Sequence, residues 1–122
     1  QLFIYWPKKL KEKHNMYWDI KKADTYTLYS PLNDIEADFI SALSSIDSLE
    51  NKIIDASKIA FTESVKLVLS CCSKAHLDAH KSFVVVVGNM FSLSDLKELF
   101  VVVPTISEAI DYIYMEELEK NL

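Results

Sequence analysis

The sequence lacks several features that define well-known classes of protein. It contains no arginine, and its single glycine is Gly88. Arginine is the side chain that binds phosphates and guanine edges through two hydrogen bonds, so an arginine-free chain with a net charge of -5 is a poor nucleic-acid binder. One glycine cannot supply the glycine-rich loop of a P-loop or dinucleotide-binding enzyme. The G-x-S-x-G and H-E-x-x-H motifs of common hydrolases and metalloproteases are also missing.

No stretch of the sequence has the length of a membrane-spanning helix or the form of a secretory signal. The apolar run Phe83 to Val87 has strand length, whereas a membrane helix needs about 18 or more consecutive apolar residues. The apolar segment Leu2 to Trp6 is too short for a signal peptide, and lysines follow it instead of preceding it. The only two cysteines, Cys71 and Cys72, are adjacent, which disfavours a disulfide between them. We therefore expect free thiols and a cytoplasmic location.

Charge is distributed unevenly along the chain. The first 22 residues carry six lysines against Glu12 and Asp19, whereas the rest carries seven lysines against sixteen acids. The length of 122 residues favours one domain. We expect residues 1–15 to form a basic N-terminal arm or leader, and residues 16–122 to form the domain. The lysines of the arm are typical of a solvated segment, with contact to an acidic surface as the alternative.

Short β-type runs bounded by turn residues predict the strands. Residues 16–20 and 25–30 predict a hairpin joined by a polar turn. Three more strands are expected at residues 53–56, 83–87 and 101–103. The run 83–87 is apolar at every position, which is typical of a strand covered on both faces of a parallel sheet. We therefore expect it to be an inner strand that lies parallel to 53–56.

Four segments combine helical spacing of apolar residues with a start signal. The expected helices are residues 34–47, 63–79, 92–99 and 106–118. Capping residues are expected at Asn33, Thr62, Ser92 and Thr105. The resulting order is β-β-α-β-α-β-α-β-α. It predicts an α/β domain with a mostly parallel sheet of four to five strands covered by helices.

One cluster on the second expected helix has the spacing of metal ligands. Cys72, His76 and His80 are four residues apart, so one helix face could present all three to a zinc ion. However, the sequence offers no fourth ligand, and His80 lies close to the expected end of the helix. Histidines that face solvent are the stronger interpretation, and we expect neither a metal nor a cofactor.

The element order and the C-terminal sequence resemble the STAS domain family, the fold of bacterial anti-sigma-factor antagonists. The segment Leu99 to Ile113 is similar to the ending of that family, in which a strand, Pro-Thr and Glu-Ala lead into the last helix. The resemblance covers roughly residues 16–120. It implies a STAS fold and a regulatory module that has no catalytic activity.

The functional centre of the STAS family is a D-S-S-G or D-T-S-G motif that opens the helix after the third strand. In this chain the motif falls on Thr62 to Lys66: Glu63 takes the Asp position, and Ser64 takes the position of the phosphorylated hydroxyl. Val65 replaces the second serine, and Lys66 replaces the glycine. The resemblance implies that Ser64 is the phosphoacceptor and that these five residues contact the partner. An ordinary serine at the start of a helix is the alternative.

The resemblance implies three possible functions. The first is an antagonist that competes for an anti-sigma factor, itself a serine kinase, and is switched by phosphorylation at Ser64. The second is a degenerate STAS scaffold or interaction module without a phosphoswitch. The third is a STAS domain that binds a small ligand, although a chain without arginine is poorly suited to a phosphate-bearing one. The sequence leaves the oligomeric state open.

Overall fold

The fold is built on one mixed sheet. The computed structural model describes residues 12–14, 17–88 and 93–122, and within them six strands occur in the spatial order β1-β2-β3-β4-β5-β6. The strands are β1 (Glu12–His14), β2 (Trp18–Lys22), β3 (Thr27–Pro31), β4 (Lys52–Asp55), β5 (Phe83–Val86) and β6 (Val101–Val103). Neighbours run antiparallel from β1 to β3 and parallel from β3 to β6. The hairpin therefore extends one side of a parallel sheet.

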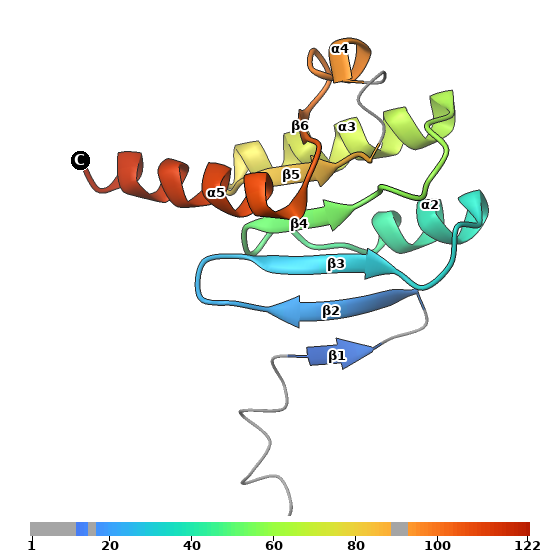
Figure 1. Ribbon diagram of the computed structural model, residues 1–122, viewed down its shortest axis with the longest axis horizontal. Helices are drawn as coiled ribbons and strands as arrows, with labels where there is room; N and C mark the ends of the chain where they lie inside the picture. The colour runs from blue at the N-terminus through green and yellow to red at the C-terminus, as the bar shows by residue number, and fades with distance from the viewer. Residues whose placement is uncertain (1–11, 15–16, 89–92) are drawn as a thin grey trace, which may run out of the picture.

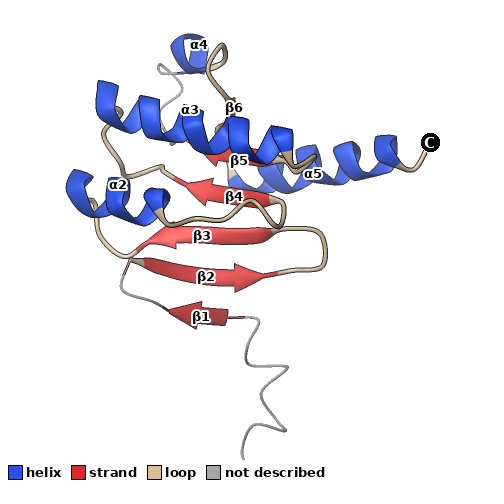
Figure 2. Ribbon diagram, turned by 180° about the vertical axis from the view of Figure 1, so that it is seen from behind, coloured by secondary structure: helices blue, strands red, loops and turns tan. Residues whose placement is uncertain are grey.

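Helices cover the sheet on both faces. The helices in the described residues are α2 (Glu36–Ser44), α3 (Glu63–Asp78), α4 (Leu93–Leu96) and α5 (Ile106–Lys120). Helices α2 and α3 lie side by side on one face, and α5 lies on the opposite face (Figures 1 and 2). The short α4 lies beyond the β5–β6 end of the sheet (Figure 1). Because α2, α3 and α5 each follow a parallel strand, all three begin at the edge where the parallel strands end.

The core has two parts, one on each side of the sheet. On the first side α2 and α3 bury Trp18, Phe39, Leu69 and the alternate strand residues Ile54 and Val85. The second side is smaller. There Ala109 and Ile113 of α5 pack on Ile53, Val84 and Val86, the strand residues that point the other way. The all-apolar sequence of β5 follows from this arrangement, because both of its faces are covered.

The fold confirms most of the expected elements. Strand β5 is an inner strand parallel to β4, and the expected order of strands and helices is present from β2 onward. The sheet has more strands than the four to five expected, because residues 12–14 pair with β2 as β1. These three residues lie in the segment expected to be an arm or leader. The boundary between residues 15 and 16 remains a prediction.

The helix starts are partly as expected. The predicted caps at Thr62 and Thr105 are confirmed, whereas Ser92 lies outside the described residues. The cap predicted at Asn33 is wrong, because α2 begins after Ile35 without a side-chain cap. Asn33 Oδ1 instead accepts a hydrogen bond from the backbone N–H of Ile35 at 2.9 Å, forming a turn that leads into the helix. In the part of the chain that the structure describes, no helix has the length and apolarity needed to cross a membrane.

Candidate functional site

The predicted switch residue lies at the edge where the parallel strands end. In open α/β sheets this edge is where ligands and partners usually bind, because the loops and helix starts converge there. The loop after β4 leads to the first turn of α3, which carries Ser64. The start of α2 lies beside it (Figure 1). The site is therefore formed by the β3–α2 loop, the β4–α3 loop and the first turn of α3.

Thr62 fixes the point at which α3 begins. Its hydroxyl oxygen accepts a hydrogen bond from the backbone N–H of Val65 at 3.3 Å, which satisfies one of the free N–H groups of the first turn. The same hydroxyl donates to a carboxylate oxygen of Glu36 at 3.1 Å. Because Glu36 is the first residue of α2, this bond joins the starts of the two helices.

The first turn of α3 presents Ser64 to solvent. Ser64 is the second residue of the helix and is exposed, whereas Val65 is completely buried in the core. Glu63 is also exposed, and its carboxylate accepts from the Lys66 ammonium at 3.2 Å. Such a pair on the surface contributes little to stability. The Lys66 side chain is therefore engaged with the acid at the motif's first position.

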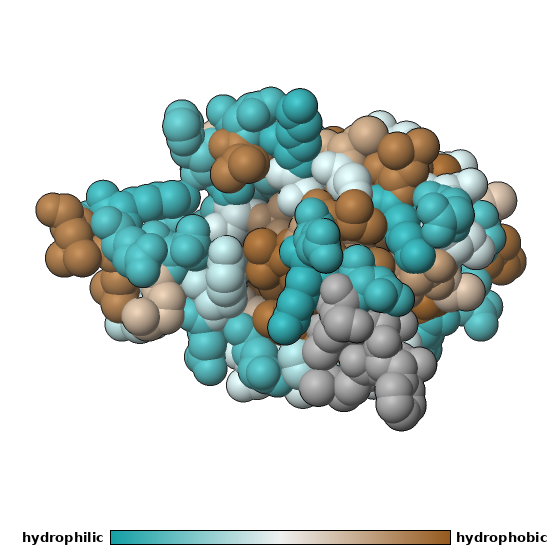
Figure 3. Space-filling model, turned by 90° about the horizontal axis from the view of Figure 1, so that it is seen from above, coloured by the Kyte–Doolittle hydropathy of each residue, from teal (hydrophilic) through white to brown (hydrophobic). Residues whose placement is uncertain are grey.

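Exposed apolar side chains occur on the elements that form this edge of the fold. Leu67, one turn further along α3, is 66% exposed, and Ile35, at the start of α2, is 53% exposed. Leu32, in the β3–α2 loop, is half exposed. Figure 3 shows hydrophobic surface among hydrophilic side chains at the end of the molecule where α2 and α3 begin. Exposed apolar residues gathered around a polar centre are typical of a protein-binding surface.

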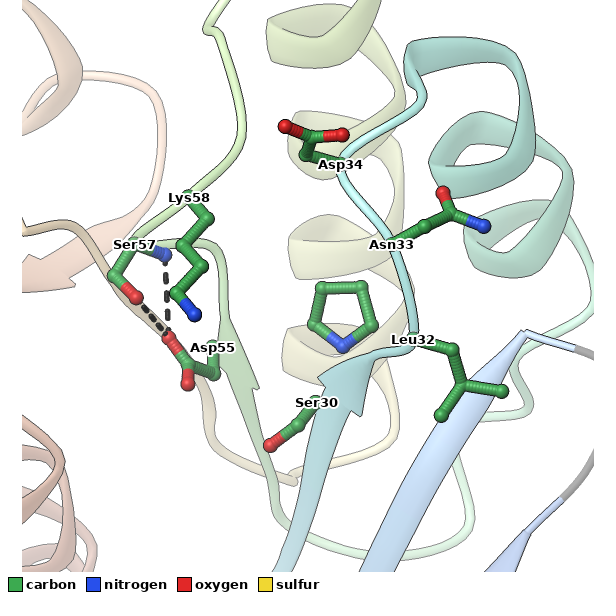
Figure 4. Close-up of a pocket in the computed structure, with 8 residues that line it drawn as sticks. Ser30, Leu32, Asn33, Asp34, Asp55, Ser57 and Lys58 are labelled. Atoms are coloured by element: carbon green, nitrogen blue, oxygen red, sulfur yellow. Dashed lines mark hydrogen bonds between the residues drawn. The ribbon is translucent and has the colours of Figure 1, made fainter.

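A pocket of about 380 Å³ lies between the two loops of this edge. Ser30, Asn33 and Asp34 line one side, and Asp55, Ser57 and Lys58 line the other (Figure 4). Sequence reasoning did not identify this pocket, because its two sides are more than 20 residues apart in the chain and only the parallel pairing of β3 with β4 brings them together.

Two short hydrogen bonds fix the start of the β4–α3 loop. One carboxylate oxygen of Asp55 accepts from the Ser57 hydroxyl at 2.7 Å and from the Ser57 N–H at 3.2 Å. On the other side, Gly88 follows β5, and a side chain there would have its Cβ 3.2 Å from the Ser57 Cβ. The single glycine of the chain therefore allows the end of β5 to approach this loop closely.

The three residues with metal-ligand spacing do not form a ligand set. His76 Nδ1 lies 2.7 Å from the Cys72 carbonyl oxygen, and its Nε2 lies 3.3 Å from the Lys52 ammonium. Burial raises the pKa of the Cys72 thiol to about 11, which keeps it protonated. His80 is exposed beyond the helix end, as expected. His76 is buried, so the expectation that it faces solvent is wrong. The described residues contain no group of three or more His, Cys, Asp or Glu placed to hold a metal ion.

Comparison with known proteins identifies the fold. No family model matches the sequence, and no curated protein matches it. A crystal structure of TM1081 from Thermotoga maritima, described there as a candidate anti-sigma factor antagonist, aligns with a TM-score of 0.64 at 15% identity, over 80% of this chain and 94% of that chain. An NMR structure of the same protein aligns with a TM-score of 0.61 at 17% identity, over 84% of this chain and 91% of the other. The expected α/β fold of the anti-sigma-factor antagonists is confirmed.

Proposed function

We propose that this chain is a non-catalytic regulatory module that binds a protein partner through the surface around Ser64. The observation that carries the proposal is the exposed hydroxyl of Ser64 in the first turn of a well-capped helix, in a fold shared with a candidate anti-sigma factor antagonist. The partner expected from this similarity is an anti-sigma factor that is also a serine kinase. Thr62, Glu63 and Lys66 complete the proposed interface, whereas Val65, also expected to contact the partner, is completely buried and supports this surface from the core.

Phosphorylation of Ser64 would change the surface without disturbing the fold. A phosphate adds about -1.5 to -2 charges at neutral pH. The first turn of a helix tolerates negative charge, because its N–H groups are free and its dipole is positive at that end. The added charge would lie beside the exposed Leu67, one turn along α3, where a docked partner must displace water. We expect phosphorylation to weaken partner binding through desolvation and repulsion.

The test compares acidic and neutral variants of two matched serines. Ser64→Asp is expected to melt normally and to bind the captured partner at least about tenfold more weakly, because a desolvated like charge costs several kcal/mol. Ser64→Ala is expected to keep binding and to abolish phosphate incorporation by the partner. Ser107→Asp is the control, because Ser107 is the exposed second residue of α5, is also preceded by a threonine cap, and lies on the other face of the sheet.

The same experiment distinguishes the alternative of a scaffold without a switch. Two of the four motif positions depart from the STAS pattern, with Val65 buried and Lys66 paired to Glu63. A normal melt with unchanged affinity in Ser64→Asp would remove the switch and leave the scaffold function. A collapsed melt in Ser64→Asp, with a normal melt in Ser107→Asp, would show that the surface assigned to Ser64 is wrong.

A further inference from the structure

A completely buried lysine lies at the opposite end of the fold from Ser64. The side chain of Lys52, the first residue of β4, has 0% exposure. Its ammonium donates to the backbone carbonyl oxygen of Asp47 at 2.7 Å and to the Asp47 carboxylate at 3.1 Å. The third contact is His76 Nε2, at 3.3 Å. An ammonium has three protons to donate, so these three acceptors satisfy it completely.

Acidic and aromatic groups from other elements face the same centre. The carboxylate of Glu50 lies 3.9 Å from the Lys52 ammonium and also accepts from the Tyr29 hydroxyl at 3.3 Å. The Tyr29 ring, from β3, has its centre 5.7 Å from the ammonium. The ring of Phe83, from β5, packs against His76 with their centres 4.8 Å apart. A second cation, Lys22 of β2, donates to the other carboxylate oxygen of Glu50 at 2.8 Å, so Glu50 lies between the two lysines.

The two neighbours of His76 define its protonation state. A carbonyl oxygen can only accept a hydrogen bond, so Nδ1, which lies 2.7 Å from the Cys72 carbonyl oxygen, carries a proton. An ammonium can only donate, so Nε2, which faces Lys52, presents its lone pair. His76 therefore holds this position as a neutral imidazole. A proton on Nε2 would face the Lys52 ammonium, which cannot accept it, and would place a second cation 3.3 Å from the first.

We propose that His76 is an acid-sensitive lock on the C-terminal half of α3: it anchors the helix to β4 as the neutral imidazole, and protonation at Nε2 releases it from Lys52. This proposal is independent of any role of Ser64. It assigns a regulatory function to a buried histidine and a buried lysine that the proposed partner surface does not use.

The turn after α3 is the element that the lock controls. The carbonyl oxygen of His76 accepts from the backbone N–H of Ala79 at 3.0 Å and from that of Lys81 at 2.8 Å. His80, between them, has a positive φ of 62°, which side chains other than glycine adopt only when their surroundings impose it. The chain then enters β5 through Ser82, whose carbonyl oxygen accepts from the Lys52 N–H at 2.9 Å. Displacement of His76 would therefore loosen residues 79–82 first.

The direction of the pH effect follows from the charges around His76. Burial lowers the pKa of His76, and the positive charge of Lys52 lowers it further. The hydrogen bond to Cys72 and the negative charges of Asp47 and Glu50 raise it. The net pKa lies below the usual value, so the unfolded chain takes up a proton more readily than the folded one. The stability that His76 contributes is present above about pH 6.5 and is lost as the pH falls through the lowered pKa.

The acids of the cluster titrate in a different range. The N–H of Leu49 lowers the pKa of Asp47, burial opposes this, and the hydrogen bond and charge of Lys52 lower it further. Burial opposes ionisation of Glu50, but the hydrogen bond from Lys22 and the charges of Lys52 and Lys22 lower its pKa overall. Both acids therefore stay ionised above about pH 4.5. Neither acid therefore changes its charge between pH 7.5 and 5.5, and a pH dependence in this range that His76→Gln removes belongs to His76 and not to the other two histidines of the chain.

The test measures urea unfolding at pH 7.5, 6.5 and 5.5 for the unmodified chain, His76→Gln and His80→Gln. Glutamine keeps an acceptor for Lys52 but does not titrate. For the unmodified chain and for the exposed-site control His80→Gln, the unfolding constant is expected to rise as the pH falls, by up to about tenfold for each unit by which the folded pKa is lowered. His76→Gln is expected to lose this dependence. An equal pH dependence in His76→Gln, or none in the unmodified chain, would overturn the lock.

A second measurement keeps the proposal testable if His76→Gln does not fold. NMR titration of the unmodified chain is expected to show that the His76 ring titrates below pH 6.5, the usual value for a histidine. The protection factors of the amides of residues 79–82, which account for the slower chemical exchange at lower pH, are expected to fall over the same pH range, while those of β5 change less. Titration of His76 at or above about pH 6.5, with unchanged protection factors in the turn, would refute the lock.

Discussion

Replacement of Ile113 by alanine tests whether α5 is an integral part of the fold. Ile113 is completely buried between α5 and the sheet, where it packs on Ile53, Val84 and Val86. Removal of an isoleucine side chain from a core costs about 2–5 kcal/mol, depending on how far the surroundings can close the cavity. The three sheet residues beneath Ile113 are hydrogen-bonded to neighbouring strands, so they cannot move toward the helix to fill the cavity. We therefore expect a loss of about 3–5 kcal/mol in the free energy of unfolding.

Chemical denaturation of Ile113→Ala and of a neighbouring control measures this loss. Tyr114 is the next residue on α5 and is 57% exposed, so Tyr114→Ala is expected to change the free energy of unfolding by no more than about 0.5 kcal/mol. Both variants should unfold with the slope of the unmodified chain, because the surface exposed on unfolding is nearly the same. A loss below about 1 kcal/mol in Ile113→Ala would mean that α5 is not packed on the sheet as the structure shows.

Two further substitutions test local features by thermal or urea unfolding. The Thr105 hydroxyl caps α5 by accepting from the Glu108 N–H at 3.1 Å. Thr105→Ala removes this bond and is expected to lower the free energy of unfolding by about 1 kcal/mol. A change below about 0.3 kcal/mol would contradict the capping role. Lys52→Met is expected to lower the free energy of unfolding less than Asp47→Ala does. Methionine replaces the buried cation with an apolar side chain of similar length, whereas Asp47→Ala leaves the cation in place with one acceptor fewer. The reverse order would show that the ammonium itself stabilises the fold.

Local sequence patterns predict an element reliably when its residues all have the same environment or when two patterns mark the same boundary. The run Phe83 to Val87 is apolar throughout, and only a strand covered on both faces requires such a sequence. Thr62 and Thr105 each lie directly before an apolar stripe with helical spacing, so the cap and the buried face point to the same helix start. Agreement between two independent local signals explains why these elements are confirmed.

Sequence reasoning failed where a residue had two local choices. Asn33 has capping-box spacing with Glu36, yet its side chain instead closes a turn onto the N–H of Ile35 and also donates to Asp38 at 3.1 Å. Asparagine favours both arrangements, and the path of the chain from β3 into α2 decides between them. Strand β1 was not predicted either, because residues 12–14 are polar and form a strand only by pairing with β2.

The buried lysine cluster could not be predicted from one stretch of sequence. Lys52 precedes Ile53 and resembles an ordinary polar residue at the start of a strand. Its burial depends on Asp47 in the preceding loop and on His76 in α3, which the fold brings together. The helical spacing of Cys72 and His76 was a real signal, since the His76 ring does bond back to the Cys72 carbonyl, but it reflects a satisfied buried histidine instead of a metal ligand.

The geometry of α3 determines how a phosphate on Ser64 could carry a signal. Val65 and Leu69 are completely buried and hold the first half of the helix on the sheet, whereas Ser64 points away from that contact. Lys66 is two positions further along, on a different side of the helix, and is already paired with Glu63, so it would not neutralise the phosphate. The new charge would therefore remain on the surface, away from the core. In the function proposed above, such a phosphate would act on a partner docked on that surface, because the fold itself would not respond.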